Sequence, residues 1–193
     1  MADRVAVINA GILQQVAAPQ TLFDEPDNLF VAAFIGSPSM NLMEGVVTES
    51  GGAHSLQLGS QSVELPASVM TARPALRDHI GKTIVAGIRP KDFEDASIVP
   101  GHPAGQRVRA QIENVEALGY ERIVYFGLDA KQVIQEDAMD LKDDAEVLQH
   151  VGARITGRFD PASTVRAGDE VEVAVAAEGT HFFDLETGLA IRD

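Results

Sequence analysis

Two short segments carry residue types used for nucleotide chemistry. Gly81-Lys82-Thr83 ends like a phosphate-binding loop, in which backbone N–H groups and a lysine hold phosphates. The glycine required five positions earlier is Leu76, and a β-branched run follows where a helix N-terminus would be needed. Asp24-Glu25-Pro26 resembles the end of a Walker B strand, but Gln20 and Thr21 interrupt the apolar run before it. We therefore expect neither segment to act on a nucleotide.

Other reactive residue types also lack the spacing that their chemistry needs. Asp140, Asp143 and Asp144 could suggest a calcium loop, but the turn glycine and the closing glutamate are missing, which favours a solvated insert. The histidines form no HExxH or paired pattern, and the chain has no cysteine. No nucleophile elbow or acid–base pair stands out. We predict no catalytic, cofactor or metal residue in this chain. The histidines are His54, His79, His102, His150 and His181.

Charge and hydropathy limit the possible partners. The 193 residues carry a formal net charge of −14, which argues against nucleic acid or an anionic membrane surface as a partner. The longest apolar run, Leu29 to Ile35, is far shorter than the roughly 20 residues that span a bilayer. We expect no direct membrane insertion. A chain of this length forms one or two domains and buries enough surface to fold without disulfides.

The first 36 residues predict a small unit of their own. Val5 to Ile8 reads as a strand covered on both faces, Asn9-Ala10-Gly11 as a turn, and Ile12 to Val16 as the returning strand. A short helix runs from Pro19 through Glu25. Asp27 is placed to cap a second helix that ends at Gly36. The apolar face predicted for that helix consists of Leu29, Phe30, Ala33 and Phe34.

From residue 42 onward the pattern is one of short strands. Their alternation and the glycine turns between them predict a closed or sandwiched antiparallel sheet. Val108, Ala110 and Ile112 alternate, and the apolar phase then slips to Val115, which predicts a β-bulge. A small helical turn lies between Pro74 and Gly81. The predicted strands are 45–49, 55–58, 62–65, 83–88, 108–117, 121–128, 171–175, 182–185 and 189–191.

The stretch MADRVAVINAGILQQVAAPQTLFDEPDNLFVAAFIGSPSMN strongly resembles the segment that leaves the ATP-binding domain of maltose-type sugar-importer ABC ATPases, the MalK family. The resemblance divides the chain into 1–36, the last hairpin and linker helices of the ATP-binding domain, and 37–193, an OB-like (TOBE) regulatory barrel. The matching positions are Asp3, Arg4, Gly11, Gln15, Pro19, Leu22, Pro26, Phe30, Val31, Ala32, Phe34 to Pro38, Met40 and Asn41. The interdomain hinge that it implies is Phe34, Ile35, Gly36, Ser37 and Pro38.

Later motifs extend the resemblance more sparsely. Gly87-Ile88-Arg89-Pro90 is similar to the family's GIRP strand end, and Val115 to Glu121, with Leu118 and Gly119, to its VExLGxE turn. Gly168-Asp169 and the closing FFDLETG hairpin also match its order. Lys91, where the family usually has Glu, and residues 136–150 depart from it. For Arg89 two roles remain open: an ion pair or carbonyl clamp at a strand end, or ligand binding.

The resemblance also implies a function. The parent would use ATP and Mg²⁺ bound upstream of residue 1 to drive carbohydrate uptake, whereas this chain would hydrolyse no ATP. Its implied partners are its own twin in a homodimer, the importer's membrane subunits and a regulatory protein, at the cytoplasmic face of the plasma membrane. One alternative is an OB-like domain that senses a small molecule, a sugar or an oxyanion. A weaker alternative is a free-standing enzyme.

Overall fold

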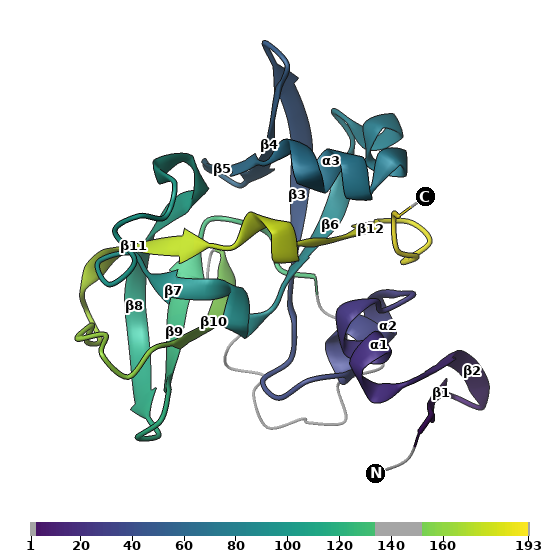
Figure 1. Ribbon diagram of the computed structural model, residues 1–193, viewed down its shortest axis with the longest axis horizontal. Coiled ribbons are helices and arrows are strands. Elements are labelled where there is room, and N and C mark those ends of the chain that lie inside the picture. The colour runs from purple at the N-terminus through teal and green to yellow at the C-terminus, as the bar shows by residue number, and fades with distance from the viewer. Residues whose placement is uncertain (1–2, 134–151, 193) are drawn as a thin grey trace.

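The computed structural model describes residues 3–133 and 152–192, and these form mainly β-structure (Figure 1). One antiparallel sheet has the strand order β12-β6-β3-β4-β5, and another has the order β10-β9-β8-β11-β7. The predicted mainly β, OB-like fold class is confirmed. The first sheet contains β3 (Asn41–Ser50), β4 (Ala53–Leu58), β5 (Gln61–Leu65), β6 (Thr83–Ile88) and β12 (His181–Asp184). The second contains β7 (Phe93–Asp95), β8 (Arg107–Ala117), β9 (Arg122–Leu128), β10 (Ala153–Phe159) and β11 (Glu170–Val175).

A single apolar core joins the two sheets. Buried residues of the first sheet, such as Met43 and Leu56, belong to the same cluster as Val108 and Phe126 of the second. Phe126 meets Phe93 edge to face, with ring centroids 5.4 Å apart. The register between β8 and β9 shifts between Ile112 and Asn114, so the predicted bulge is confirmed. This shared core fixes both sheets relative to each other.

Short helices connect the strands, and several were not predicted. Among the described residues, no helix is long and apolar enough to cross a membrane.

The sequence analysis did not predict β7, β10 and α3. In β10 the exposed Arg154 and Arg158 alternate with buried Ala153, Ile155 and Phe159. The helices after the N-terminal unit are α3 (Ala67–Ala72), η1 (Pro74–His79), η2 (Pro90–Asp92), η3 (Ala104–Gln106) and η6 (Ala177–Gly179).

The N-terminal hairpin has one covered face instead of the two predicted. β1 (Val5–Asn9) pairs with β2 (Ile12–Ala17) in a sheet of their own, at the edge of the molecule (Figure 1). Val7 is buried against Leu22 and Val31, whereas Ile8 is 60% exposed. The apolar run therefore overestimated burial, because the described residues supply packing on one side of the hairpin.

The N-terminal helices form where predicted, with different details. α1 spans Pro19–Asp24 and α2 spans Leu29–Phe34. The cap of α2 is Asn28, whose Oδ1 accepts a hydrogen bond from Val31 N at 3.0 Å, and not Asp27. The predicted apolar face is wrong as well: the buried residues are Leu29, Val31 and Ala32, while Phe30 and Phe34 stack on each other and Phe34 is 66% exposed.

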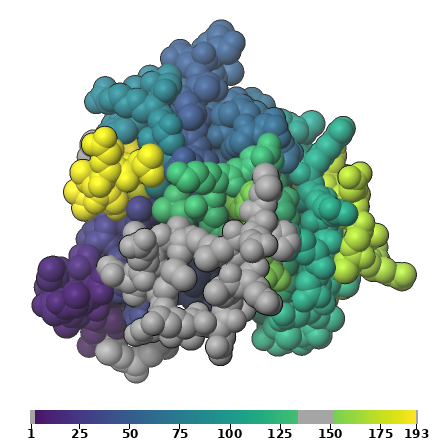
Figure 2. Space-filling view, turned by 180° about the vertical axis from the view of Figure 1, so that it is seen from behind, coloured from purple at the N-terminus to yellow at the C-terminus, as the bar shows by residue number. Residues whose placement is uncertain are grey.

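The C-terminal segment lies directly on these helices. Leu29 N donates to Gly188 O and Ala190 N donates to Asp27 O, both at 2.9 Å. The Arg192 guanidinium reaches the Asp27 carboxylate at 3.1 Å. Figure 2 shows the N-terminal residues directly beside the C-terminal ones. The two ends of the chain thus form one packed junction.

Candidate functional site at the helix–sheet junction

Arg89 is the centre of the contacts between the N-terminal helices and the first sheet. It follows β6 directly and is 1% exposed. Its Nε donates to Phe23 O at 3.1 Å, Nη1 donates to Ile35 O at 2.8 Å, and Nη2 also donates to Phe23 O. These carbonyls lie at the C-terminal ends of α1 and α2, where a helix lacks its own donors. The carbonyl clamp, one of the two roles left open by the sequence, is the arrangement found here.

Electrostatics keep this buried guanidinium charged at neutral pH. Burial lowers the pKa of Arg89 to about 10, while Asp92 and Asp24 act to raise it. A cation is favourable at these two helix C-termini, because their carbonyls carry partial negative charge. The three guanidinium nitrogens donate to two carbonyls, Phe23 O and Ile35 O, so both the donors and the acceptors have partners at this buried position.

The glycine of the predicted hinge, Gly36, lies against the same guanidinium. Gly36 has φ +124°, a conformation that side chains with a Cβ rarely adopt. A Cβ there would lie 3.1 Å from Arg89 Nη1 and 3.3 Å from Pro38 O. Ile35 supplies its carbonyl to the clamp, Ser37–Pro38 is a cis peptide, and Phe34 faces outward. The structure therefore brings together the hinge and Arg89, which the sequence had named separately.

The rest of the GIRP segment is buried beside the clamp. Gly87, in the middle of the sheet, leaves space for Met40 and Phe183; a Cβ on it would lie 2.5 Å from Met40 Sδ. Ile88 is fully buried in the core, and Pro90 opens η2. These residues position Arg89 rather than offer polar groups of their own.

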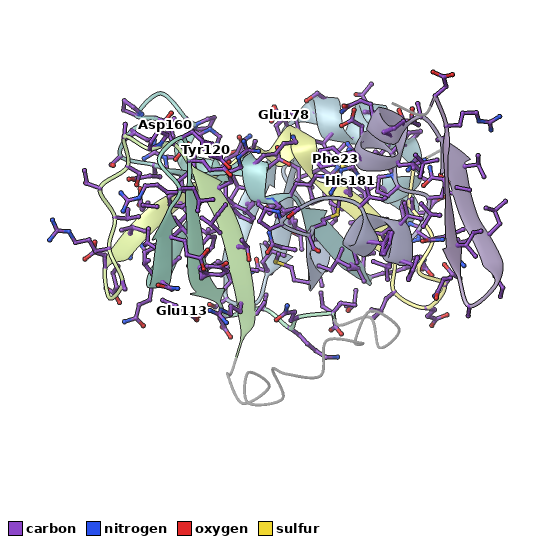
Figure 3. The ribbon with its side chains drawn as sticks, turned by 90° about the horizontal axis from the view of Figure 1, so that it is seen from below. Phe23, Glu113, Tyr120, Asp160, Glu178 and His181 are labelled. Atoms are coloured by element: carbon purple, nitrogen blue, oxygen red, sulfur yellow. The ribbon has the colours of Figure 1, made fainter. Side chains whose placement is uncertain are left out.

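The second motif lies elsewhere. Leu118 and Gly119 form the turn between β8 and β9, closed by a hydrogen bond from Leu118 N to Glu121 O at 3.0 Å. Gly119 has φ +88°, and the Glu121 carboxylate pairs with Arg158 of β10. This turn belongs to the other sheet, and Figure 3 shows Tyr120 of the turn well away from Phe23. The structure does not bring the two motifs into one site.

Comparison with known proteins identifies the family. The model of the MalK OB fold domain matches residues 36–93, from the hinge glycine through the clamp. The trehalose/maltose import ATP-binding protein MalK of Thermococcus litoralis is 37% identical over 99% of this chain and 45% of its own length. The chain belongs to the C-terminal, MalK-type OB domains of ABC importer ATP-binding proteins.

Two further relatives show the same partial coverage. The oligosaccharides import ATP-binding protein MsmX of Bacillus subtilis is 34% identical over 100% of this chain and 45% of its own length. The sn-glycerol-3-phosphate import ATP-binding protein UgpC of Chromobacterium violaceum is 37% identical over 97% of this chain and 41% of its own length. This MalK-type chain therefore spans less than half the length of the curated relatives it matches.

The residues weighed for catalysis and metals are scattered in this MalK-type domain. Gly81-Lys82-Thr83 leads into strand β6 and not into a helix, and Asp24 ends α1. No group of three or more potential metal ligands occurs among residues 3–133 and 152–192. His102 Nε2 lies 2.9 Å from Val175 O, which is a structural contact. Asp140, Asp143, Asp144 and His150 lie outside the described residues.

A polar cavity beside the clamp was missed by the sequence analysis. It has a volume of about 440 Å³ and lies between the end of α1, the end of α3 and the C-terminal segment. Its charged and titratable lining is Asp24, Glu25, Arg73, His181 and Arg192. These residues come from three distant parts of the chain, so no local spacing could have indicated them. Figure 3 shows Phe23, Glu178 and His181 gathered in this region.

Proposed function

We propose that this chain is the regulatory and dimerisation module of the ATPase subunit of a carbohydrate ABC importer. The parent would couple hydrolysis of Mg²⁺-bound ATP to sugar uptake at the cytoplasmic face of the plasma membrane, in contact with the importer's membrane subunits. The family membership and the names of the maltose/trehalose and oligosaccharide relatives support this proposal. In it, residues 37–193 form the regulatory domain and residues 1–36 belong to the connection with the ATPase.

The Arg89 clamp is the observation that carries the proposal. A regulatory domain can influence an ATPase only through contacts that hold the two together, and Arg89 bonds the first sheet to the carbonyl ends of both linker helices. The hinge glycine packs against the same guanidinium. A displacement of the sheet would therefore be transmitted to α1 and α2.

Sedimentation equilibrium of the chain tests the dimerisation part. We expect a reversible monomer–dimer equilibrium in the micromolar range, because closed two-fold pairs are the commonest homo-oligomers. A monomer at high micromolar concentration contradicts it. Binding of labelled ATP by this chain, abolished in Lys82→Ala, would contradict the assignment of nucleotide chemistry to the parent's ATP-binding domain.

The second candidate, sensing of a small molecule, is supported by the cavity lined by Arg73 and His181. The two functions are compatible, since a ligand in a junction between domains changes how they contact each other. They differ in one measurement: a ligand that binds the folded chain raises its melting temperature, whereas dimerisation alone makes that temperature depend on protein concentration.

A further inference from the structure

The cavity at the junction brings two arginines, Arg73 and Arg192, into one lining with the carboxylates of Asp24 and Glu25. Arg73 and Arg192 line it, and an adjoining pocket of about 140 Å³, which shares Asp24, Arg73 and His181 with it, is lined by Arg89 and Lys91. Arg89 is fully engaged by backbone carbonyls and Lys91 by Asp92. Arg192 is bonded to the Asp27 carboxylate and to Pro26 O, so Arg73 is the arginine of this lining whose guanidinium has no polar partner among the described residues.

Arg73 lacks a polar partner. Its guanidinium carbon lies 5.6 Å from the centroid of the Phe182 ring, and the guanidinium forms no hydrogen bond or ion pair with any residue the structure describes. Burial and the nearby charge of Arg192 both lower the pKa of Arg73. A half-buried guanidinium whose five N–H donors have no partner in the described protein is able to donate to an anion in the cavity.

His181 adds a neutral donor to the same cavity. The imidazole stacks on Phe183 and forms no hydrogen bond within the described part of the chain. Burial lowers its pKa to about 3, helped by Arg89, Arg73, Arg192 and Lys91, so the ring is uncharged at neutral pH. A neutral imidazole carries one N–H donor and one acceptor.

The acidic residues of the lining suit a ligand that also carries hydroxyl groups. Asp24 and Glu25 lie on the α1 side of the cavity, and Glu178 lies in the adjoining pocket. Ionised carboxylates accept hydrogen bonds from hydroxyls but repel a bare phosphate. The volume of the cavity is within the range of small-molecule sites.

We propose that this cavity binds a small phosphate-bearing molecule, with the phosphate held chiefly by Arg73, His181 donating its ring N–H, Arg192 adding positive charge at the wall, and Asp24 and Glu25 accepting hydrogen bonds from hydroxyls of the remainder. The planar fork of arginine matches phosphate oxygens in a bidentate manner. Sugar phosphates and free phosphate both present the phosphate oxygens that an arginine would bind. The proposal does not rest on the function proposed above, because this chain by itself supplies every side chain of the binding site.

Isothermal titration of the native chain with inorganic phosphate, glucose 6-phosphate and glucose tests the proposal, at an ionic strength held constant with NaCl. We expect saturable binding of both phosphates and none of glucose. Arg73→Gln should weaken binding at least tenfold, whereas Arg77→Gln, an exposed arginine of the neighbouring η1, should leave it unchanged. Tighter binding of glucose 6-phosphate than of phosphate identifies a phosphate ester as the ligand, and equal binding identifies free phosphate.

A second measurement avoids dependence on any variant. In NMR spectra of the native chain, the imidazole signals of His181 should shift as phosphate is added, and those of His102, which is bonded to Val175 O and does not line the cavity, should not. Three results would overturn the proposal: no saturable binding by the native chain, equal binding by native chain and Arg73→Gln, or equal loss of affinity in both arginine variants. Arg73→Gln should melt close to the native chain, since it loses only the contact with the Phe182 ring and no hydrogen bond or ion pair of the guanidinium.

Discussion

The Arg89 guanidinium contacts both the aromatic ring and the backbone carbonyl of Phe23. The guanidinium carbon lies 3.7 Å from the centroid of the Phe23 ring, and Arg89 Nε donates to the Phe23 carbonyl at 3.1 Å. The ring supplies a cation–π contact and the carbonyl supplies an acceptor at the end of α1. Because Ile35 O accepts a further bond, one side chain fixes both α1 and α2 to the first sheet.

Replacement of Arg89 by methionine should destabilise the chain by about 3 kcal/mol or more, because the carbonyls of Phe23 and Ile35 are left without donors. Arg89→Lys should recover part of this loss, since one ammonium group cannot reproduce the fork that spans two carbonyls. Urea unfolding at pH 7 measures both. Arg77→Met, at an exposed arginine, is the control and should change stability by less than about 0.5 kcal/mol. Equal effects at both positions would show that the clamp contributes nothing specific.

Gly36→Ala should be more harmful than Gly119→Ala. Both glycines have positive φ, +124° and +88°, but a Cβ at Gly119 meets nothing within 4 Å, whereas one at Gly36 lies 3.1 Å from Arg89 Nη1. We expect Gly119→Ala to cost about 1 kcal/mol and Gly36→Ala clearly more, because it adds crowding of the clamp to backbone strain. Thermal unfolding of the two variants gives the comparison. Equal losses would indicate that backbone strain alone matters at the hinge.

The strands were largely predictable, because their apolar alternation and glycine turns are local signals. Thr83–Ile88 was placed with its observed bounds, and the phase slip after Ile112 located the bulge. The burial of side chains in the N-terminal unit could not be predicted, because it depends on what packs against each face of the unit. Phe34 looks like a core residue by type, yet it is exposed, while Val31 beside it is buried.

The site could be predicted only in part, for a related reason. Arg89 was identified from its strand-end motif, but its acceptors, Phe23 O and Ile35 O, are backbone atoms of ordinary residues that carry no sequence signal. Arg73 and Arg192 each look like surface arginines in their local sequence. They share a cavity only because the C-terminal segment folds back onto the N-terminal helices.

Asn41 should be a major polar link between the two sheets. Its side chain in β3 donates to Ile88 O at 3.0 Å and to Thr156 O of β10 at 2.9 Å, and it accepts from Thr156 N at 2.8 Å. Asn41→Leu should cost about 1 to 3 kcal/mol, because it leaves the buried Ile88 O and the half-buried backbone groups of Thr156 without the Asn41 side chain as partner. Urea unfolding measures the loss, and Asn114→Leu, at an exposed site, is the control. A loss below about 0.5 kcal/mol would contradict the role of this link.

The free energy of unfolding should decrease as the pH is lowered through a window set by the pKa of His181. Its pKa is about 3 in the folded chain against an ordinary value of 6.5, so between these values the unfolded state binds the additional proton. The stabilisation is complete above pH 6.5 and is lost as the pH falls toward 3. Between pH 7 and pH 5 the loss should be about 2 kcal/mol. Urea unfolding in phosphate-free buffer at several pH values measures it. His181→Gln should flatten the profile; a profile with the native slope would assign the effect to other groups.

Val7 should supply the main apolar contact of the hairpin, beside the hydrogen bonds that Gln15 forms with Glu25 O and Asp27 N. Val7 is 3% exposed and packs with Leu22 and Val31, whereas Ile12 on the paired strand is 66% exposed. Val7→Ala should release the hairpin from the helices at a cost of about 1 to 2 kcal/mol, so amide exchange in residues 5–17 should become markedly faster while exchange in β6 stays slow. Ile12→Ala, which removes more apolar atoms from a solvated position, should leave exchange of the hairpin nearly unchanged. Hydrogen exchange read by mass spectrometry at two protein concentrations gives the comparison. Faster exchange in both variants would show that the hairpin depends on its exposed face, and complete exchange of residues 5–17 within seconds in the native chain would show that it is not docked on the helices at all.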